Sequence, residues 1–305
     1  MPSIDELLAP QTELLRVATG ATWSEGPCWI PQSQTLRWSD IHGDRILEYS
    51  PETGDSGEYR REVEYTNGRT LHPDGPVIQC SHGRRRVETD DGDQVKPLVT
   101  GWAEGRFNSP NDVIIAGDRS VWFTDPHYGI TVPGEGHPGE MEYGGCYVFR
   151  WDPVSETAHP VITEVPEPNG LAFSPDESIL YVADSSAVRK EPGVGHHHVV
   201  AYEVDWTQPE PVCRGGTILF EIAHGVPDGI RVDHEGCIWS SAADGVHVFS
   251  PSGMPLGHLP VPEVVGNLCF GGREGHDLYI AATTSIYHIK TTVQDAAWDH
   301  RWSHP

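Results

Sequence analysis

Four residues with side-chain oxygens recur at the same point of a repeated strand pattern. They are Glu25, Asn111, Asn169 and Asp228, and each is followed by a short apolar run, a turn and a second apolar run. If the repeats surround a common axis, two carboxylates and two amide oxygens converge on it. Oxygen donors with two negative charges suit calcium, magnesium or manganese better than zinc, which usually takes His or Cys. A cation with an open coordination position could polarise a carbonyl group or lower the pKa of a bound water.

The same residues are also typical of turns. Asn and Asp hydrogen-bond to their own backbone and Gly allows a positive φ, so any single Asn-Gly or Asp-Gly pair favours a turn. Four copies in phase, always with an oxygen-bearing residue, favour a common site instead. Two further copies are degenerate, and we interpret their Asn67 and Asn267 as turn residues.

The repeats also predict the fold. Copies begin near residues 25, 67, 111, 169, 228 and 267, and a spacing of about 40 to 60 residues is typical of four-stranded propeller blades. Alternating apolar residues between Gly, Pro and Asp turns indicate antiparallel hairpins. We therefore expect an all-β, six-bladed β-propeller with four-stranded antiparallel blades, in which residues 1–305 form a single domain.

Both ends of the chain should contribute to this ring. The strand-like segment 13–18 should complete the last blade, because an open edge would leave backbone groups unpaired. Ser3 and Glu6 have capping-box spacing, which predicts a short N-terminal helix.

Two long insertions separate the central copies. Residues 131–143 are rich in Gly, Pro and Glu, and residues 187–198 are rich in Gly and His. Insertions of this kind can shape a substrate pocket. The second ends in the triplet His196-His197-His198. Because adjacent strand residues point to opposite faces, we interpret the triplet as a solvated loop rather than a zinc site.

The charge of the chain limits its partners. Its 20 basic and 45 acidic residues give a formal net charge of -25, which repels nucleic acids and anionic membrane surfaces. No apolar stretch approaches the roughly 20 residues that a spanning helix needs, and the first residues do not resemble a secretory signal. We expect a soluble cytoplasmic protein that binds small molecules and cations, without nucleic-acid or membrane partners.

Five motifs carry a family resemblance: Ser24-Glu25-Gly26-Pro27, Asn108-Ser109-Pro110-Asn111-Asp112-Val113, Thr124-Asp125-Pro126-His127-Tyr128-Gly129, Pro168-Asn169-Gly170-Leu171 and Pro227-Asp228-Gly229. Together they resemble the gluconolactonase and regucalcin family, also called the senescence marker protein family. The resemblance covers roughly residues 25–289. The Asp-Pro-x-Tyr-Gly run is more similar to the bacterial lactonases than to regucalcin.

The resemblance implies a six-bladed propeller with one central divalent cation and lactone-hydrolysing activity. By motif, Glu25, Asn169 and Asp228 would hold the cation. Asp228 would also act as acid or base while the cation polarises the carbonyl of a sugar lactone. The residues implied in substrate binding are Asn111, Asn108, His127 and Tyr128.

The nature of the cation and of the reaction is less constrained. Calcium is the expected cation, with zinc, magnesium or manganese as alternatives. A propeller of this kind could instead hydrolyse organophosphates or aryl esters, because a Lewis-acidic cation also polarises a phosphoryl oxygen. Outside the enzymes, the chain could be a non-catalytic calcium-binding scaffold.

Overall fold

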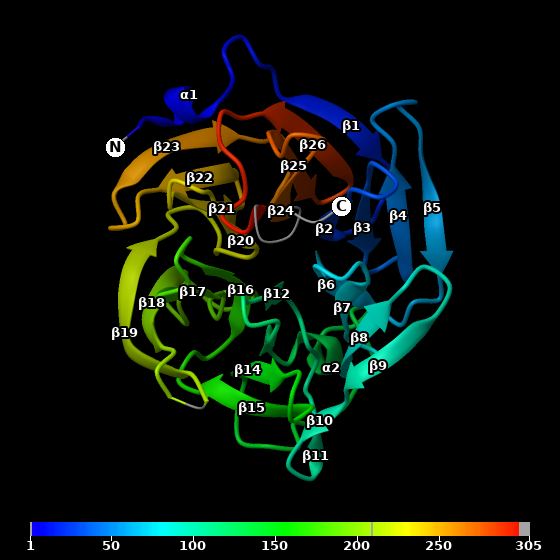
Figure 1. Cartoon of the computed structure of the whole chain (residues 1–305), viewed down its shortest axis with the longest axis vertical. Coiled ribbons are helices and arrows are strands. Elements are labelled where there is room, and N and C mark those ends of the chain that lie inside the picture. The colour runs from blue at the N-terminus through cyan, green and yellow to red at the C-terminus, as the bar shows by residue number, and fades with distance from the viewer. Residues whose placement is uncertain (1, 209, 299–305) are drawn as a thin grey trace.

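The computed structural model describes residues 2–208 and 210–298. In this part of the chain, six four-stranded antiparallel sheets surround a central axis (Figure 1). Five of these sheets, or blades, are built from strands that follow one another along the chain, and the sixth combines strands from both ends. The predicted all-β six-bladed propeller is therefore confirmed.

In each blade the first strand lies nearest the axis and the fourth lies at the rim (Figure 1). From the inside outward, blade 1 consists of β2 (Ser24–Ile30), β3 (Thr35–Asp40), β4 (Arg45–Tyr49) and β5 (Ser56–Arg61). Blade 2 consists of β6 (Thr66–Leu71), β7 (Val77–Ser81), β8 (Arg86–Asp90) and β9 (Val95–Val99). Blade 3 consists of β12 (Val113–Ile115), β13 (Val121–Asp125), β14 (Tyr147–Asp152) and β15 (Thr157–Ile162). Blade 4 consists of β16 (Pro168–Phe173), β17 (Ile179–Asp184), β18 (His198–Asp205) and β19 (Val212–Glu221). Blade 5 consists of β20 (Ile230–Val232), β21 (Ile238–Ala242), β22 (Gly245–Phe249) and β23 (Pro255–Pro260). Blade 6 consists of β24 (Val265–Gly271), β25 (Asp277–Ala282), β26 (Ser285–Lys290) and β1 (Leu15–Thr19).

Three short elements lie outside the blades. The helix α1 (Ile4–Leu7) precedes β1, and the predicted capping box is present, because the backbone N and the hydroxyl of Ser3 both donate to Glu6 Oε2, at 2.8 and 3.0 Å. The hairpin β10 (Gly101–Trp102) and β11 (Gly105–Arg106) links blades 2 and 3, and the helix α2 (Tyr128–Thr131) follows β13.

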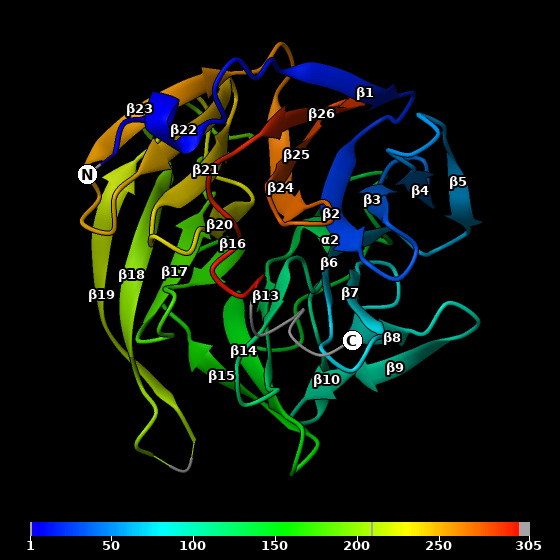
Figure 2. The same cartoon turned by 45° about the horizontal axis from the view of Figure 1, so that its top comes forward.

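The sixth blade closes the ring with strands from both ends of the chain. β1 pairs antiparallel with β26, and Thr19 lies opposite Ser285 (Figures 1 and 2). This pairing confirms the closing strand expected from residues 13–18. It covers the edge that β26 would otherwise expose.

Aromatic side chains pack between neighbouring blades. Trp38, Trp122 and Trp239 lie on the second strands of three blades and are at most 1% exposed. The ring of Trp122 lies edge-on to Phe173 of the next blade, with centroids 5.1 Å apart. Because a buried aromatic ring removes about 150–250 Å² from water, these contacts fix each blade against its neighbour and hold the inner strands in place.

The C-terminal segment crosses one end of the central channel. Ala296 N donates to Val232 O, and His234 N donates to Gln294 O, both at 2.9 Å. These partners lie in or just after β20, and Asp295 lines a small cavity together with residues of β2, β6, β12 and β24, so this segment lies over the end at which the inner strands finish. No pattern in the sequence predicts this course.

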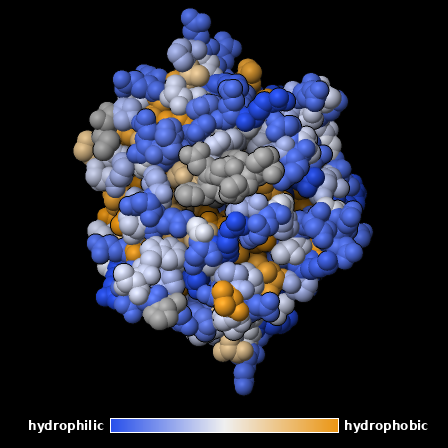
Figure 3. Space-filling view, in the orientation of Figure 1, coloured by the Kyte–Doolittle hydropathy of each residue, from blue (hydrophilic) through white to orange (hydrophobic). Residues whose placement is uncertain are grey.

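The surface of the molecule agrees with the polar and acidic composition of the chain. The face seen in Figure 3 is largely hydrophilic, with apolar residues scattered over it. The helices of the described residues, α1 and α2, have four residues each, and neither has the length or apolarity to cross a membrane.

Candidate active site

A cavity of about 480 Å³ lies at the end of the channel where the inner strands begin. Residues from all six blades and their loops line it, including Glu25, Asn111, Tyr128, Asn169 and Asp228. Five of the seven residues predicted for the site are thus brought to one cavity. Its volume suits a small organic molecule.

Backbone irregularities lie where the inner strands carry these side chains. The pairing of β2 with β3 shifts register between Glu25 and Cys28, and that of β16 with β17 shifts between Pro168 and Leu171. A bulge of this kind changes the direction of a side chain without ending the strand. Glu25 and Asn169 lie at these shifts and line the cavity.

Glycines beside the site residues allow neighbouring inner strands to come into contact. Gly170 N donates to Asp228 O at 3.0 Å, and Gly68 N donates to Asn111 O at 2.8 Å. A Cβ atom on Gly170 would lie only 2.2 Å from Asp228 O. Here the residue-plus-glycine pattern reflects close contact between strands around the axis rather than turns.

Two carboxylates lie together at the cavity. Glu25 is 3% exposed, and its Oε2 accepts a hydrogen bond from Gly26 N at 2.9 Å. Burial raises the pKa of Glu25 to about 8, and the negative charge of Asp112 adds to this rise. Asp228 lies deep in the protein but stays partly exposed because it borders the cavity. Burial, followed by the charge of Glu25, raises the pKa of Asp228 well above its usual value.

This donor set fits a divalent cation. The charge of Glu25 disfavours the charged form of Asp228, and a cation between the two carboxylates would stabilise both charged forms. Together with the nearby amide groups they offer only oxygen ligands, which is the donor chemistry of calcium, magnesium and manganese.

A chain of amide groups lines the same cavity as these carboxylates. Asn67 Nδ2 donates to Asn111 Oδ1 at 2.5 Å, and Asn111 Nδ2 donates to Asn169 Oδ1 at 2.6 Å. The ring of His82 supports the chain, because its Nε2 lies 3.0 Å from Asn111 Oδ1 and its Nδ1 lies 2.9 Å from the carbonyl oxygen of Glu135. The amide orientations are therefore fixed by several partners at once.

The interpretation of Asn67 and Asn267 as turn residues is wrong. Asn67 lies in β6 and lines the cavity, and Asn267 lies in β24, where its side chain hydrogen-bonds to Glu25. The pair Asn67-Gly68 repeats the pattern of Asn169-Gly170, so the sequence did contain a signal for it. His82 carries no such signal, because only the fold brings the β7–β8 turn to the site.

The two insertions meet at the side of the cavity. Arg189 from the second insertion forms an ion pair of 2.6 Å with Glu135 from the first, and the Glu135 side chain is only 8% exposed. Tyr128 from α2 and Val188 from the second insertion line the cavity beside this pair. The ion pair thus joins two loops that are more than 40 residues apart in the chain.

Asn108 and His127 lie beside the cavity rather than in its lining, as far as the described residues show. Asn108 is fully buried, and its Nδ2 donates to Asp125 O at 3.1 Å and to Gly145 O at 3.0 Å. His127 Nδ1 lies 3.4 Å from Cys146 Sγ. Asn108 thus holds the backbone on either side of the first insertion, and the predicted contact of Asn108 and His127 with substrate stays a prediction.

Known proteins of similar sequence and structure include several lactonases. The gluconolactonase of Zymomonas mobilis is 31% identical over 95% of this chain and 84% of its own length. A pentonolactonase from Haloferax volcanii is 29% identical over 87% of this chain and 82% of its own. The structure of a gluconolactonase from Xanthomonas campestris superposes with a TM-score of 0.86 at 34% identity, covering 94% of this chain and 92% of that one.

The family model named SMP-30/Gluconolactonase/LRE-like region matches residues 23–284, which include all six inner strands and the whole cavity floor. That match extends over most of the chain and agrees with the propeller and with the lactonase relatives. The chain belongs to the SMP-30/gluconolactonase family.

Proposed function

We propose that this protein hydrolyses a sugar lactone with the help of one divalent cation held by Glu25, Asn169 and Asp228. The observation that carries the proposal is the meeting of a buried and a partly exposed carboxylate with an amide chain at one small-molecule cavity. The named activities of its relatives support the substrate class. The oxygen-only donor set favours calcium as the cation, ahead of magnesium, manganese and zinc.

The two carboxylates have different roles in this proposal. Glu25 is almost fully buried and accepts a hydrogen bond from Gly26 N, so in this proposal it serves as a ligand of the cation. Asp228 borders the cavity, so its carboxylate can take a proton from an attacking water and return it to the ring oxygen that leaves. When bound, the cation would supply Lewis acidity towards the lactone carbonyl.

The other lining residues bind and orient the substrate. Asn111 is held by three neighbours, so its amide presents a fixed polar group to the sugar ring. Tyr128 contributes to the cavity wall, and burial raises the pKa of its hydroxyl, so that this group stays protonated. The pair Arg189 and Glu135 covers the side of the cavity and limits access of bulk water.

The proposal is tested by metal reconstitution. Chelated protein is reloaded separately with calcium, magnesium, manganese or zinc, and hydrolysis of glucono-1,5-lactone is followed beside that of an aryl ester and an organophosphate. We expect lactone hydrolysis that depends on the cation and exceeds the other two reactions. Faster hydrolysis of the aryl ester or the organophosphate would show that the proposed substrate class is wrong. Tight calcium binding without turnover on a lactone panel would favour a non-catalytic scaffold.

A variant tests the role of Asp228. Because general acid–base catalysis contributes about 10²–10⁴-fold, Asp228→Asn should lower kcat by at least the lower part of this range and weaken cation binding. Asp93→Asn, in an exposed turn, is the matched control and should leave both unchanged. A fully active Asp228→Asn protein that retains its cation would overturn the assignment.

A further inference from the structure

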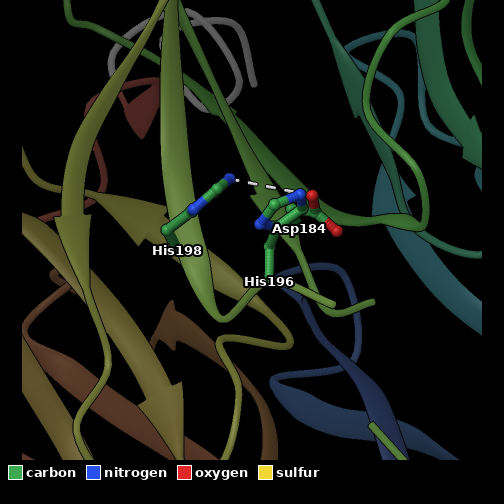
Figure 4. Close-up of side chains that lie close together, drawn as sticks. All are labelled: Asp184, His196 and His198. Carbon is green, nitrogen blue, oxygen red and sulfur yellow. Dashed lines mark ion pairs between the residues drawn. The ribbon is translucent and has the colours of Figure 1, made fainter. Parts of the chain in front are cut away.

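A second group of metal-binding side chains lies outside the cavity, in blade 4. Asp184 ends β17, His198 begins β18, and His196 lies at the end of the insertion between them (Figure 4). One ligand atom from each of the three lies within 4.8 Å of those of the other two. His198 Nε2 is 3.7 Å from Asp184 Oδ2, and the rings of His196 and His198 stack with centroids 4.7 Å apart.

The strand register explains why these residues meet. Asp184 and His198 are direct partners in the pairing of β17 with β18. His196 precedes His198 by two residues and therefore points to the same face, whereas His197 points away and its Nδ1 lies 2.7 Å from Ile222 O. Alternation thus separates His197 from its neighbours but brings the other two histidines together.

The interpretation of the histidine triplet as a solvated loop is therefore wrong for its last member. His198 lies in a strand and is 6% exposed, while His196 is exposed. The group thus combines two buried ligands, Asp184 and His198, with one exposed ligand, His196.

The donor set differs from that of the cavity. Two imidazoles and one carboxylate suit zinc and its neighbours in the first transition series, whereas oxygen donors alone suit calcium and magnesium. Tetrahedral zinc with bonds of about 2.0–2.1 Å holds its ligand atoms roughly 3.4 Å apart, so a small rotation of the exposed His196 closes the site. Ser186 N donates to Asp184 Oδ1 at 3.0 Å, which orients the carboxylate from behind.

We infer that Asp184, His196 and His198 bind one zinc-like transition-metal ion that clamps the base of the segment 185–197, which connects β17 with β18 and contains most of the second insertion. The ligands come from both ends of this segment, and water would complete the coordination shell. The same segment carries Val188 and Arg189 to the cavity wall. An ion at its base therefore holds the cavity wall in place without touching the substrate.

Trypsin cleavage within the insertion can show whether a bound metal ion holds it closed. Arg189 and Lys190 are trypsin cleavage sites with half-exposed side chains, 53% and 37%. Cleavage requires local opening of the segment. At zinc 100-fold above its Kd, binding to the closed form stabilises it by about 2.7 kcal/mol, which is roughly a 100-fold smaller opened population.

The experiment follows trypsin cleavage at Arg189 and Lys190 in chelated, calcium-reloaded protein with and without zinc. We expect zinc to slow cleavage of the wild-type protein by at least about tenfold and to have no such effect on His196→Ala, whose exposed site leaves the fold intact. His196→Cys keeps a zinc ligand and should restore protection. Equal protection in His196→Ala, or no protection of the wild type at saturating zinc, would overturn the inference.

Two controls separate this site from others. The double variant His247→Ala/His258→Ala removes a more exposed histidine pair beside Asp244 in blade 5 and should keep the protection. Asp228→Asn alters the cavity and should also keep it. Loss of zinc protection in either control would assign the effect to another site and contradict the clamp.

Discussion

Gly170 N donates to Asp228 O, and this close contact requires that residue 170 has no Cβ atom. The position of Asp228 therefore depends on the glycine in the neighbouring strand. Gly170 does not need a positive φ, so the constraint is one of space rather than backbone strain. The nearest obstacle is Asp228 O itself, which is backbone and cannot move without its residue. A methyl group at position 170 therefore displaces the residue that we assign as acid or base.

Gly170→Ala should accordingly lower both stability and activity. Overpacking of this kind typically costs about 1–3 kcal/mol, and kcat should fall with it because Asp228 moves. Urea unfolding and lactone hydrolysis measure the two effects. Gly57→Ala in β5, where a Cβ meets nothing within 4 Å, is the control, and equal behaviour of the two variants would contradict the argument.

The raised pKa of Glu25 predicts how the metal-free protein responds to pH. The folded pKa is about 8 against a usual value of 4.5, so folding favours the protonated form. Its contribution to stability is full below about pH 4.5 and is lost as the pH rises through 8. We expect the melting temperature of chelated protein to fall over this window, and the calcium-bound protein to fall less because bound calcium favours the carboxylate. In chelated Glu25→Gln the fall should be smaller, and an unchanged fall would assign it to other groups.

Among the residues of the site, those in the strand repeat could be predicted from the sequence and the others could not. Glu25 and Asp228 stand at a fixed place in a repeated pattern, and the fold brings that place to the axis. His82 and Glu135 reach the site from turns and insertions whose paths depend on contacts with other blades. Such contacts leave no periodic trace in the sequence.

The two insertions act together through one ion pair. Glu135 is largely buried, and Arg189 is the nearest cation to it, with His42 Nε2 farther away at 3.7 Å. Removing the guanidinium leaves the buried carboxylate without its closest partner, and the insertions lose the contact that joins them.

Arg189→Ala should therefore weaken substrate binding more than it slows the chemical step. We expect KM for the lactone to rise several-fold and kcat to change less, because Arg189 lines the cavity and forms its ion pair with Glu135 rather than with Glu25 or Asp228. Steady-state kinetics on glucono-1,5-lactone provides the measurement. Arg214→Ala, which breaks an exposed pair with Asp205 at the rim of blade 4, should leave both constants unchanged. An unaltered KM in Arg189→Ala would show that the ion pair does not contribute to substrate binding.

At the level of the whole ring, β1 is the element that joins the two ends of the chain. The strand is short, but without it β26 would become an open edge. The sequence predicted this closure because the strand-like segment 13–18 could pair with an edge of the last blade that would otherwise stay open. It could not predict the C-terminal cover of the channel, which rests on backbone hydrogen bonds to β20 and its following turn rather than on any residue pattern.

Deleting residues 2–19 should open the ring. The truncated protein should unfold at lower urea concentration and self-associate as its concentration rises, because edge strands pair with one another. Urea unfolding and size-exclusion chromatography at several concentrations report both effects. Deleting residues 2–9 removes α1 but keeps β1, so it should not promote association. A monodisperse 2–19 deletion with full stability would contradict the closing role of β1.

The C-terminal segment across the channel has a kinetic meaning for the proposed reaction. Because this segment lies across the far end of the channel, we expect substrate and product to pass through the end at which the inner strands begin. An opened sugar acid must leave by the same mouth through which the next lactone enters, so product and substrate exclude each other from the protein. Accumulated product should therefore act as a competitive inhibitor, because the sugar acid must leave the cavity before the next lactone can bind.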